Sequence, residues 1–154
     1  MGSFFKSFKW AGRGVWQVVK RERNFRLHLC AGFYVYLFSL FYALSAVQYV
    51  VLTVLICGVL ALEILNSAVE RLVDLICNEP NEKAGLVKDM AAGAVLVFCV
   101  GAAGCGVLLF WDVEVFGKIV RHFGAYPILL ILLLVSLAFC GWFIFGWNRE
   151  GKAR

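Results

Sequence analysis

Four long apolar stretches constrain this chain more than any other feature. None contains Asp, Glu, Lys or Arg, and they span Leu27–Val47, Tyr49–Leu62, Met90–Trp111 and Tyr126–Trp147. A helix that crosses the hydrocarbon core of a bilayer needs about 20 mostly apolar residues. Hydrophobic residues make up 62% of the chain and charged residues only 16%, whereas a soluble domain is about a quarter charged. The sequence therefore predicts a membrane protein.

The predicted fold is all-α, with a surface helix at the N-terminus and four transmembrane helices. The second of these is expected to cover roughly Gln48–Ala68 and to continue beyond the hydrocarbon as an amphipathic segment. The expected order is a surface helix at 1–26, three membrane helices within 27–111, an extracytoplasmic loop at 112–125, an additional membrane helix at 126–147 and a tail at 148–154. The alternative has three spans, with the last segment lying on the membrane surface. The length of that segment and its lack of charge argue against this alternative.

The N-terminal arm, residues 1–26, is basic and aromatic. It carries seven Lys or Arg residues and lacks the long apolar core of a cleavable signal peptide. Phe4, Phe5 and Phe8 recur at helical spacing, and Trp16 follows a stretch with two glycines. A basic helix with aromatic residues of this kind usually lies along a membrane interface. We therefore expect anionic lipid headgroups as partners, and not nucleic acid, because the basic charge adjoins a membrane anchor.

The distribution of Lys and Arg predicts the orientation in the membrane. Thirteen lie in the N-terminal arm, around the loop after the second span, and in the C-terminal tail; only Lys118 and Arg121 lie elsewhere. By the positive-inside rule, both termini are expected in the cytoplasm. The six cysteines show neither CxxC nor Cys/His ligand spacing, which predicts small apolar residues and not disulfides or a zinc site. The two histidines, His28 and His122, are isolated, and the sequence assigns neither a role.

A stripe of polar residues follows the second apolar stretch. At about 100° per residue, five positions fall within a strip about 100° wide on an otherwise mostly apolar helix: Glu63, Asn66, Ser67, Glu70 and Asp74. Solvation of an amphipathic helix would explain Asp74. It does not explain Glu63, which follows 13 residues without a charge. An acid near the hydrocarbon costs a few kcal/mol and usually serves a function.

The chemistry of the stripe leaves more than one function open. Carboxylate and amide oxygens suit Mg²⁺, which keeps waters or phosphates as its remaining ligands. A carboxylate partly removed from water is a stronger base than one at the surface, which suits a general base. The same stripe would also fit a proton or cation transporter, for which we expect inverted repeats or interrupted spans. A non-enzymatic scaffold is a third alternative, but it leaves Glu63 without a purpose.

Two further polar segments flank the stripe. The loop "CNEPNEKAGLVKDM" has turn residues up to Asn81, so a new helix should begin near Glu82 or Lys83. Lys88 then enters the membrane either as an interfacial anchor or as a cation for phosphate. Small residues follow it and favour close helix packing, while a Walker-type phosphate loop does not occur. Glu22, the one acid of the N-terminal arm, could pair with a base such as Arg26 or complete a carboxylate cage with Glu70.

These segments resemble the small bacterial integral-membrane diacylglycerol kinases, a family that includes the undecaprenol kinases of Gram-positive bacteria. The resemblance covers residues 4–111 and is carried by "EILNSAVE" (63–70) and "KDMAAGAVL" (88–96). The segment "ERNFRLH" (22–28) is more similar to the undecaprenol kinase branch. The resemblance implies a homotrimer in the bacterial cell membrane that uses ATP and Mg²⁺ to phosphorylate a lipid alcohol at the cytoplasmic interface.

The resemblance also implies roles for individual residues. Glu63 would be the catalytic base, and Glu22 and Glu70 would hold the metal on the ATP phosphates. The nucleotide site would in addition contain Asn66, Asp74, Lys88 and Asp89. Two departures stand out: Asn81-Glu82 replaces a His-Glu pair found in some members, and residues 112–154 extend beyond the usual three spans. The extra span could pack on the outside of the trimer, gate the access of lipid, or return the tail to the cytoplasm.

Overall fold

The structure is a computed structural model that describes residues 2–77, 79 and 81–147, so the predicted tail 148–154 lies outside the described residues. The described chain forms six α-helices: α1 (Gly2–Arg21), α2 (Arg23–Ser39), α3 (Ala46–Ile76), α4 (Glu82–Phe110), α5 (Val113–Ala125) and α6 (Pro127–Phe145). The predicted all-α membrane fold is confirmed, because α3, α4 and α6 are each long and apolar enough to cross a membrane.

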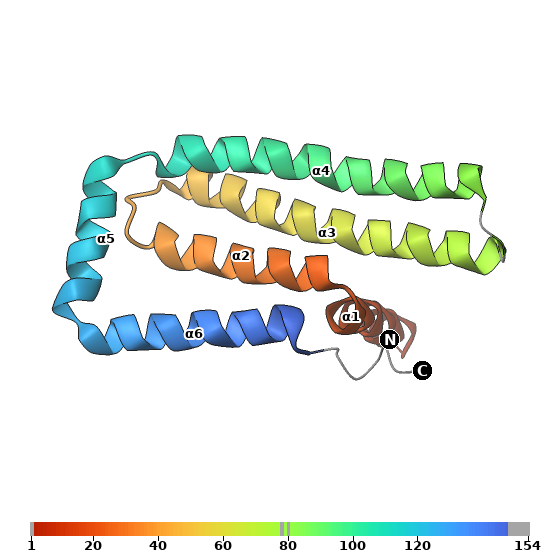
Figure 1. Cartoon of the computed structure of the whole chain (residues 1–154), viewed down its shortest axis with the longest axis horizontal. Helices are drawn as coiled ribbons and strands as arrows, with labels where there is room; N and C mark the ends of the chain where they lie inside the picture. The colour runs from red at the N-terminus through yellow and green to blue at the C-terminus, as the bar shows by residue number, and fades with distance from the viewer. Residues whose placement is uncertain (1, 78, 80, 148–154) are drawn as a thin grey trace.

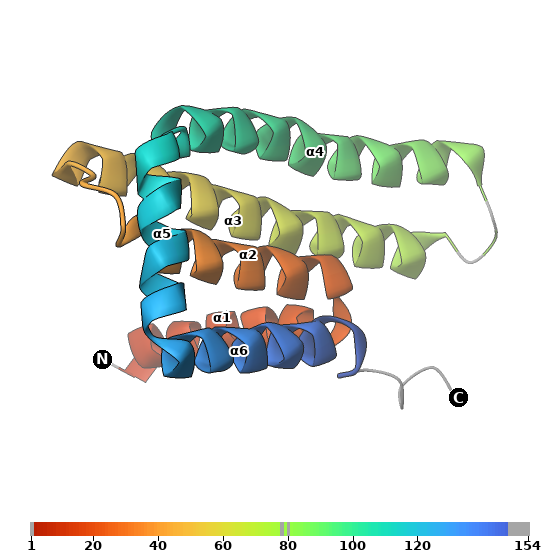
Figure 2. The same ribbon diagram turned by 60° about the vertical axis from the view of Figure 1, so that its left-hand side comes forward.

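The four long helices after α1 lie side by side in the order α4, α3, α2, α6 (Figure 1). Helix α5 runs across one end of this layer and joins α4 to α6, as both views show (Figures 1 and 2). Helix α1 packs at the other end, where α2 begins and α6 ends. The N-terminal surface helix and the extra C-terminal helix therefore meet at the same end of the molecule.

Helix α2 differs from the predicted span over Leu27–Val47. It begins earlier, at Arg23, and ends at Ser39, so its 17 residues lie at the lower limit for a transmembrane helix. The apolar residues after Ser39 form a turn, in which Tyr42 N donates to Ser39 O at 3.0 Å. The sequence boundary was too late because the turn to α3 is itself apolar, so hydropathy did not mark the end of the helix.

Polar caps mark the starts of the two longest helices. Ser45 and Gln48 form a capping box at the start of α3, with Ser45 N donating to Gln48 Oε1 at 2.7 Å. Asn81 caps α4 by accepting a hydrogen bond from Lys83 N at 2.9 Å, so that α4 begins at the predicted Glu82. At 31 residues, or about 46 Å, α3 is longer than the hydrocarbon core is thick. This agrees with the predicted continuation of the second span beyond the hydrocarbon.

The segment 112–125, expected as an extracytoplasmic loop between two spans, contains the helix α5, which the sequence analysis did not predict. Asp112 caps this helix by accepting hydrogen bonds from Glu114 N at 2.9 Å and Val115 N at 3.2 Å. Val115 is buried while Phe116 is exposed, as expected for an amphipathic helix.

Close packing of α3 on its neighbours depends on two glycines. A Cβ at Gly32 of α2 would lie 2.8 Å from Ile56 Cγ2 on α3. A Cβ at Gly58 of α3 would overlap the Phe98 ring on α4. Small residues at these positions permit the backbones to approach, which is how helices pack in lipid. The close packing of α2, α3 and α4 therefore depends on the absence of a side chain at Gly32 and at Gly58.

The Gly58→Ala substitution is expected to destabilise the protein because the new methyl group displaces Phe98. Overpacking typically costs about 1–3 kcal/mol, which for a chain of this size lowers the melting temperature by several degrees. Thermal unfolding in detergent, followed by near-ultraviolet circular dichroism, would measure the change. Gly141→Ala in α6 is the matched control, because a Cβ there meets no atom within 4 Å. A Gly58→Ala protein as stable as this control would contradict the packing argument.

The extra helix α6 packs on α2 along its length. Near the middle, the hydroxyls of Tyr34 and Ser136 are 2.9 Å apart. At the end next to α1, Arg26 Nη2 donates to Ile144 O at 3.0 Å, and its guanidinium lies 6.0 Å from the centre of the Phe143 ring. Helix α6 therefore covers the face of α2 that points away from α3 and α4 (Figure 1).

Candidate functional site

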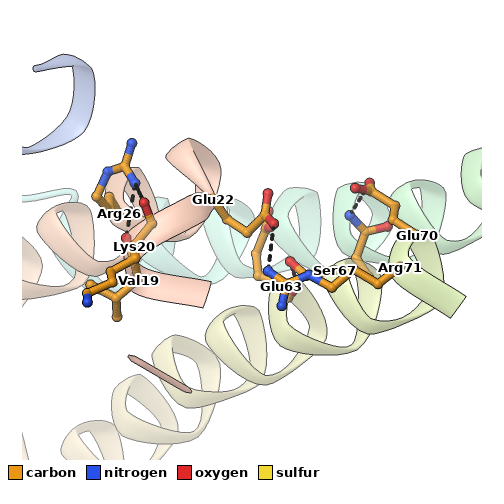
Figure 3. A network of polar contacts seen from close by, with 9 residues as sticks. Val19, Lys20, Glu22, Arg26, Glu63, Ser67, Glu70 and Arg71 are labelled. Atoms are coloured by element: carbon orange, nitrogen blue, oxygen red, sulfur yellow. Dashed lines mark hydrogen bonds and ion pairs between the residues drawn. The ribbon is translucent and has the colours of Figure 1, made fainter. Parts of the chain in front are cut away.

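The polar stripe of α3 forms a connected face in the structure. Figure 3 shows Glu63, Ser67 and Glu70 following one another along this helix. Glu63 and Ser67 are buried, with 5% and 3% of their surfaces exposed, and Ser67 Oγ donates to Glu63 O at 3.0 Å. Asn66 Nδ2 donates to Glu70 Oε1 at 2.9 Å. The burial of Glu63 fits the expectation that an acid at this depth is turned inward.

Glu22 reaches this stripe from the junction of α1 and α2. It stands at the N-cap of α2 in an extended conformation and points toward α3 (Figure 3). Its Oε1 lies 3.3 Å from Arg71 Nη2. The carboxylates of Glu22 and Glu70 are both near enough to Glu63 to interact with it electrostatically. Three of the acids that the sequence singled out, Glu22, Glu63 and Glu70, therefore lie near one another.

The side chain of Arg26 holds the junction that carries Glu22 by donating hydrogen bonds to backbone carbonyls. Its side chain is buried, and Nη1 donates to Val19 O at 3.0 Å and to Lys20 O at 3.1 Å (Figure 3). These carbonyls lie in the last turn of α1, where backbone acceptors lack partners within the helix. Together with the bond to Ile144 O, the guanidinium connects α1, α2 and α6. The carboxylate of Glu22 pairs with Arg71 of α3, and its place in a carboxylate cage with Glu70 stays a prediction.

His28 belongs to the site, although nothing in the sequence pattern singled it out. Its Nε2 lies 3.2 Å from Glu63 Oε1. The contact depends on the register between α2 and the antiparallel α3, which no local pattern in the sequence specifies. A polar residue within an apolar stretch was the only available signal. The other histidine, His122, instead packs among aromatic rings, with its centroid 5.2 Å from that of Phe41.

A second polar cluster lies nearer the α3–α4 turn. Lys88 of α4 forms an ion pair with Asp74 of α3. The residue after Lys88, Asp89, is exposed. A cleft of about 620 Å³ is lined by both members of the pair together with Val73, Cys77, Glu79, Asn81, Glu82, Ala84 and Gly85. The divergent pair Asn81-Glu82 therefore lines the same cleft as Asp74 and Lys88, two of the predicted nucleotide residues.

An apolar groove of about 310 Å³ lies between α2, α3 and α4. Its described lining is His28, Ala31, Gly32, Val35, Leu52, Leu55, Ile56, Val59, Cys99, Ala102, Ala103, Gly106 and Phe110. Along each helix these residues recur every turn from the level of His28 toward the α5 end. At one end the groove reaches His28, whose Nε2 contacts Glu63.

The residues present fit a magnesium ion shared with phosphates. Among the described residues, no group of three or more His, Cys, Asp or Glu side chains is arranged to hold a metal by itself. Mg²⁺ in phosphate-transfer sites is commonly held by only one or two carboxylates plus substrate phosphates. Glu22 and Glu70 supply two, and the buried Oδ1 of Asn66 beside Glu70 has no hydrogen-bond partner in the described structure. An unpaired buried oxygen is what a cation or its water would satisfy.

The six cysteines are free thiols. Cys30 is buried, as expected of a small apolar residue, whereas Cys57 is exposed on the single chain. Cys99 lines the apolar groove.

Comparisons with known proteins assign the family. The family model of prokaryotic diacylglycerol kinase matches residues 9–110, which correspond to α1–α4. An undecaprenol kinase of Bacillus subtilis is 42% identical over 110 residues, which cover 71% of this chain and 89% of that protein. A diacylglycerol kinase of Synechocystis is 39% identical over 66% of this chain and 61% of its own length. A diacylglycerol kinase of Escherichia coli is 32% identical over 68% of this chain and 84% of its own length.

The matched region contains Glu22, the α3 stripe and the Asp74–Lys88 cleft, whereas α5 and α6 lie beyond it. The extent of this match decides between an enzyme and the transporter or scaffold that the stripe alone left open. The chain belongs to the prokaryotic diacylglycerol kinase family and is a lipid kinase.

Proposed function

We propose that this kinase transfers the γ-phosphate of ATP to the hydroxyl of undecaprenol or diacylglycerol at the cytoplasmic face of the bacterial cell membrane. The observation that carries the proposal is the position of Glu63. This buried acid contacts His28, which lines the apolar groove, and it lies on the same helix as the exposed Asp74 of the polar cleft. One substrate is soluble in lipid and the other in water, so a site between groove and cleft can reach both.

In this proposal, each part of the site has a separate task. The groove between α2, α3 and α4 holds the aliphatic part of the lipid and aims its hydroxyl at Glu63, the catalytic base. Asn66 and Glu70, together with Asp74, Lys88 and Asp89, bind the nucleotide. Lys88 adds positive charge beside the phosphates, where phosphoryl transfer needs it most.

Glu22 and Glu70 would hold Mg²⁺, with the carbonyl oxygen of Asn66 beside them. When bound, this ion neutralises charge on the phosphates as the transfer proceeds. Arg71 holds Glu22 through Oε1 and keeps its carboxylate directed at α3. The ion pair between Lys88 and Asp74 orients the lysine toward the cleft in the same way.

The described helices also support a position in the membrane. The basic helix α1 exposes Phe4, Phe5 and Phe8, which suits a surface helix on anionic lipids. We place both termini and the polar cleft in the cytoplasm, as the Lys/Arg distribution predicts. The helix α4 carries glycines outside the groove lining at which an added Cβ would meet no atom within 4 Å, namely Gly93, Gly101 and Gly104. Such a surface suits packing against further copies in the proposed homotrimer.

A transfer assay with γ-labelled ATP tests the proposal. In mixed micelles with Mg²⁺, label is expected in the extracted lipid when undecaprenol or diacylglycerol is present, and removal of Mg²⁺ by EDTA is expected to abolish it. Parallel reactions with the two alcohols identify the preferred substrate by kcat/KM. An octanol reaction serves as the control for chain length, because it occupies little of the groove. Folded protein that labels neither lipid would contradict the proposed function.

A further inference from the structure

Helix α5 crosses the end of the molecule that lies opposite the α3–α4 turn (Figures 1 and 2). It joins the last residue of α4, Phe110, to the first residue of α6, Pro127, and both α4 and α6 are long and apolar enough to cross a membrane. Because these helices lie side by side, they cross a bilayer together, and α5 runs across their ends. The ends of the two spans therefore place α5 at the boundary between hydrocarbon and water, with its axis along the membrane plane.

An aromatic residue stands at each end of α5. Trp111 precedes the helix and Tyr126 follows it, and both side chains are exposed. Tryptophan and tyrosine are enriched at membrane–water interfaces, because the ring lies at the level of the headgroups and its polar atom reaches water. The two residues therefore give α5 the same depth as the ends of the spans do.

Helix α5 has two apolar faces, and the protein covers one of them. The covered face carries the buried Val115 and Phe123, whose ring packs against aromatic rings of α2 and of the turn after it. The other face carries Val113, Phe116 and Val120, with 79%, 65% and 58% of their surfaces exposed. At about 100° per residue, these three positions fall within a strip about 60° wide. A contiguous exposed apolar face of this kind marks a contact with lipid or protein.

The charged side chains of α5 lie on a third face. Glu114, Lys118 and Arg121 are exposed and fall within a strip about 60° wide, whose centre is about 140° from that of the exposed apolar strip. The ion pairs within the described residues involve neither Lys118 nor Arg121. A helix that lies in the interface keeps such a face among the headgroups, where long basic side chains reach lipid phosphates.

We propose that α5 binds the membrane surface on the side opposite the polar cleft. Val113, Phe116 and Val120 would lie among the acyl chains, and Lys118 and Arg121 would contact anionic phospholipid headgroups. Phe116 also lines an apolar groove of about 370 Å³ between α2, α4 and α5, which gives an acyl chain of a bound phospholipid a place beside the helix. This site is separate from the polar stripe of α3 and lies outside residues 9–110, which the family model covers.

A protein partner explains less of this surface than lipid does. A second copy of the chain could cover the exposed apolar face. It would not account for an interfacial aromatic residue at each end of α5, or for two unpaired bases at a depth where lipid phosphates supply the opposite charge. The position between two membrane spans therefore favours lipid.

Photocrosslinking in vesicles tests the proposal with the full-length protein. The Phe116→p-benzoylphenylalanine variant is reconstituted in equimolar phosphatidylglycerol and phosphatidylcholine and illuminated, and adducts on peptides of α5 are measured by mass spectrometry. Lipid adducts are expected, with phosphatidylglycerol favoured about fivefold or more, since each base near an anionic surface contributes about a factor of five. The Glu114→p-benzoylphenylalanine variant is the matched control, because it places the same probe on the charged face and should give several-fold fewer lipid adducts.

The Lys118→Gln/Arg121→Gln double substitution tests the headgroup contact. Lipid adducts at position 116 are expected to persist, whereas the preference for phosphatidylglycerol should disappear. An unchanged preference would overturn the role of the two bases. Lipid adducts no more abundant at 116 than at 114, or crosslinks to a second protein chain in their place, would overturn the membrane contact. Melting temperatures in detergent check the folding of each variant, and the readout needs no kinase activity, so it is independent of the proposed function.

Discussion

Glu63→Gln is expected to lower kcat by about 10²–10⁴-fold, the usual contribution of general base catalysis, while the KM for ATP stays within a few-fold. The amide keeps the shape of the side chain and can still contact His28, but it has no negative charge. Proton removal from the lipid hydroxyl then fails, because the amide is not a base. Steady-state kinetics at saturating lipid, with ATP varied, would separate the effect on kcat from that on KM.

Glu114→Gln is the control for Glu63→Gln. Glu114 is an exposed carboxylate on α5 and lies outside residues 9–110, which the family model covers. This control is expected to retain full activity. A Glu63→Gln enzyme with near-normal kcat would remove Glu63 from the reaction. The burial of Glu63 would then need a structural explanation, such as its bond with His28.

Glu70→Ala is expected to weaken the use of Mg·ATP and to leave lipid binding unchanged. Loss of one charged ligand costs roughly 1.5–3 kcal/mol, which corresponds to about a tenfold or larger rise in the Mg²⁺ concentration needed for half-maximal rate. The substitution also leaves Asn66 Nδ2 without its acceptor. Titration of activity with free Mg²⁺, at fixed ATP and saturating lipid, would measure the shift.

Glu114→Ala is the control for Glu70→Ala and should titrate with Mg²⁺ as the wild type does. If the midpoint for Glu70→Ala is also unchanged, Glu70 is not a metal ligand. A lower rate at every Mg²⁺ concentration, without a change in the midpoint, would mean that Glu70 contributes to the reaction by some means other than binding the metal.

Much of the fold and of the site was predictable because each feature repeats along one element. Apolar runs identified the long helices, and the spacing of Glu63, Ser67 and Glu70 placed them on one face of α3, along which Figure 3 shows them. The turn chemistry at Asn81 predicted the start of α4. The end of α2 and the helical state of α5 were missed, because the first depends on an apolar turn and the second on a short amphipathic segment.

Contacts between helices were the part that the sequence could not supply. The pair His28–Glu63 depends on the register of α2 against α3, and the pair Asp74–Lys88 depends on how α4 returns along α3. Glu22 was suspected from its position before the first span, but its partner Arg71 was not. Hydropathy sets which faces are buried, whereas register follows from side-chain shape, including the space left by Gly32 and Gly58.

The hydrogen bond from Arg26 to Ile144 O connects the C-terminal helix α6 to the junction of α1 and α2. The same guanidinium holds the last turn of α1, one residue before the junction that presents Glu22. Removal of the residues beyond the length of the shorter relatives would leave the buried guanidinium of Arg26 with two of its three hydrogen-bond acceptors, because Ile144 O belongs to the removed segment. The family-length portion of this polypeptide is therefore a poor substitute for the whole in crystallisation or inhibitor screening.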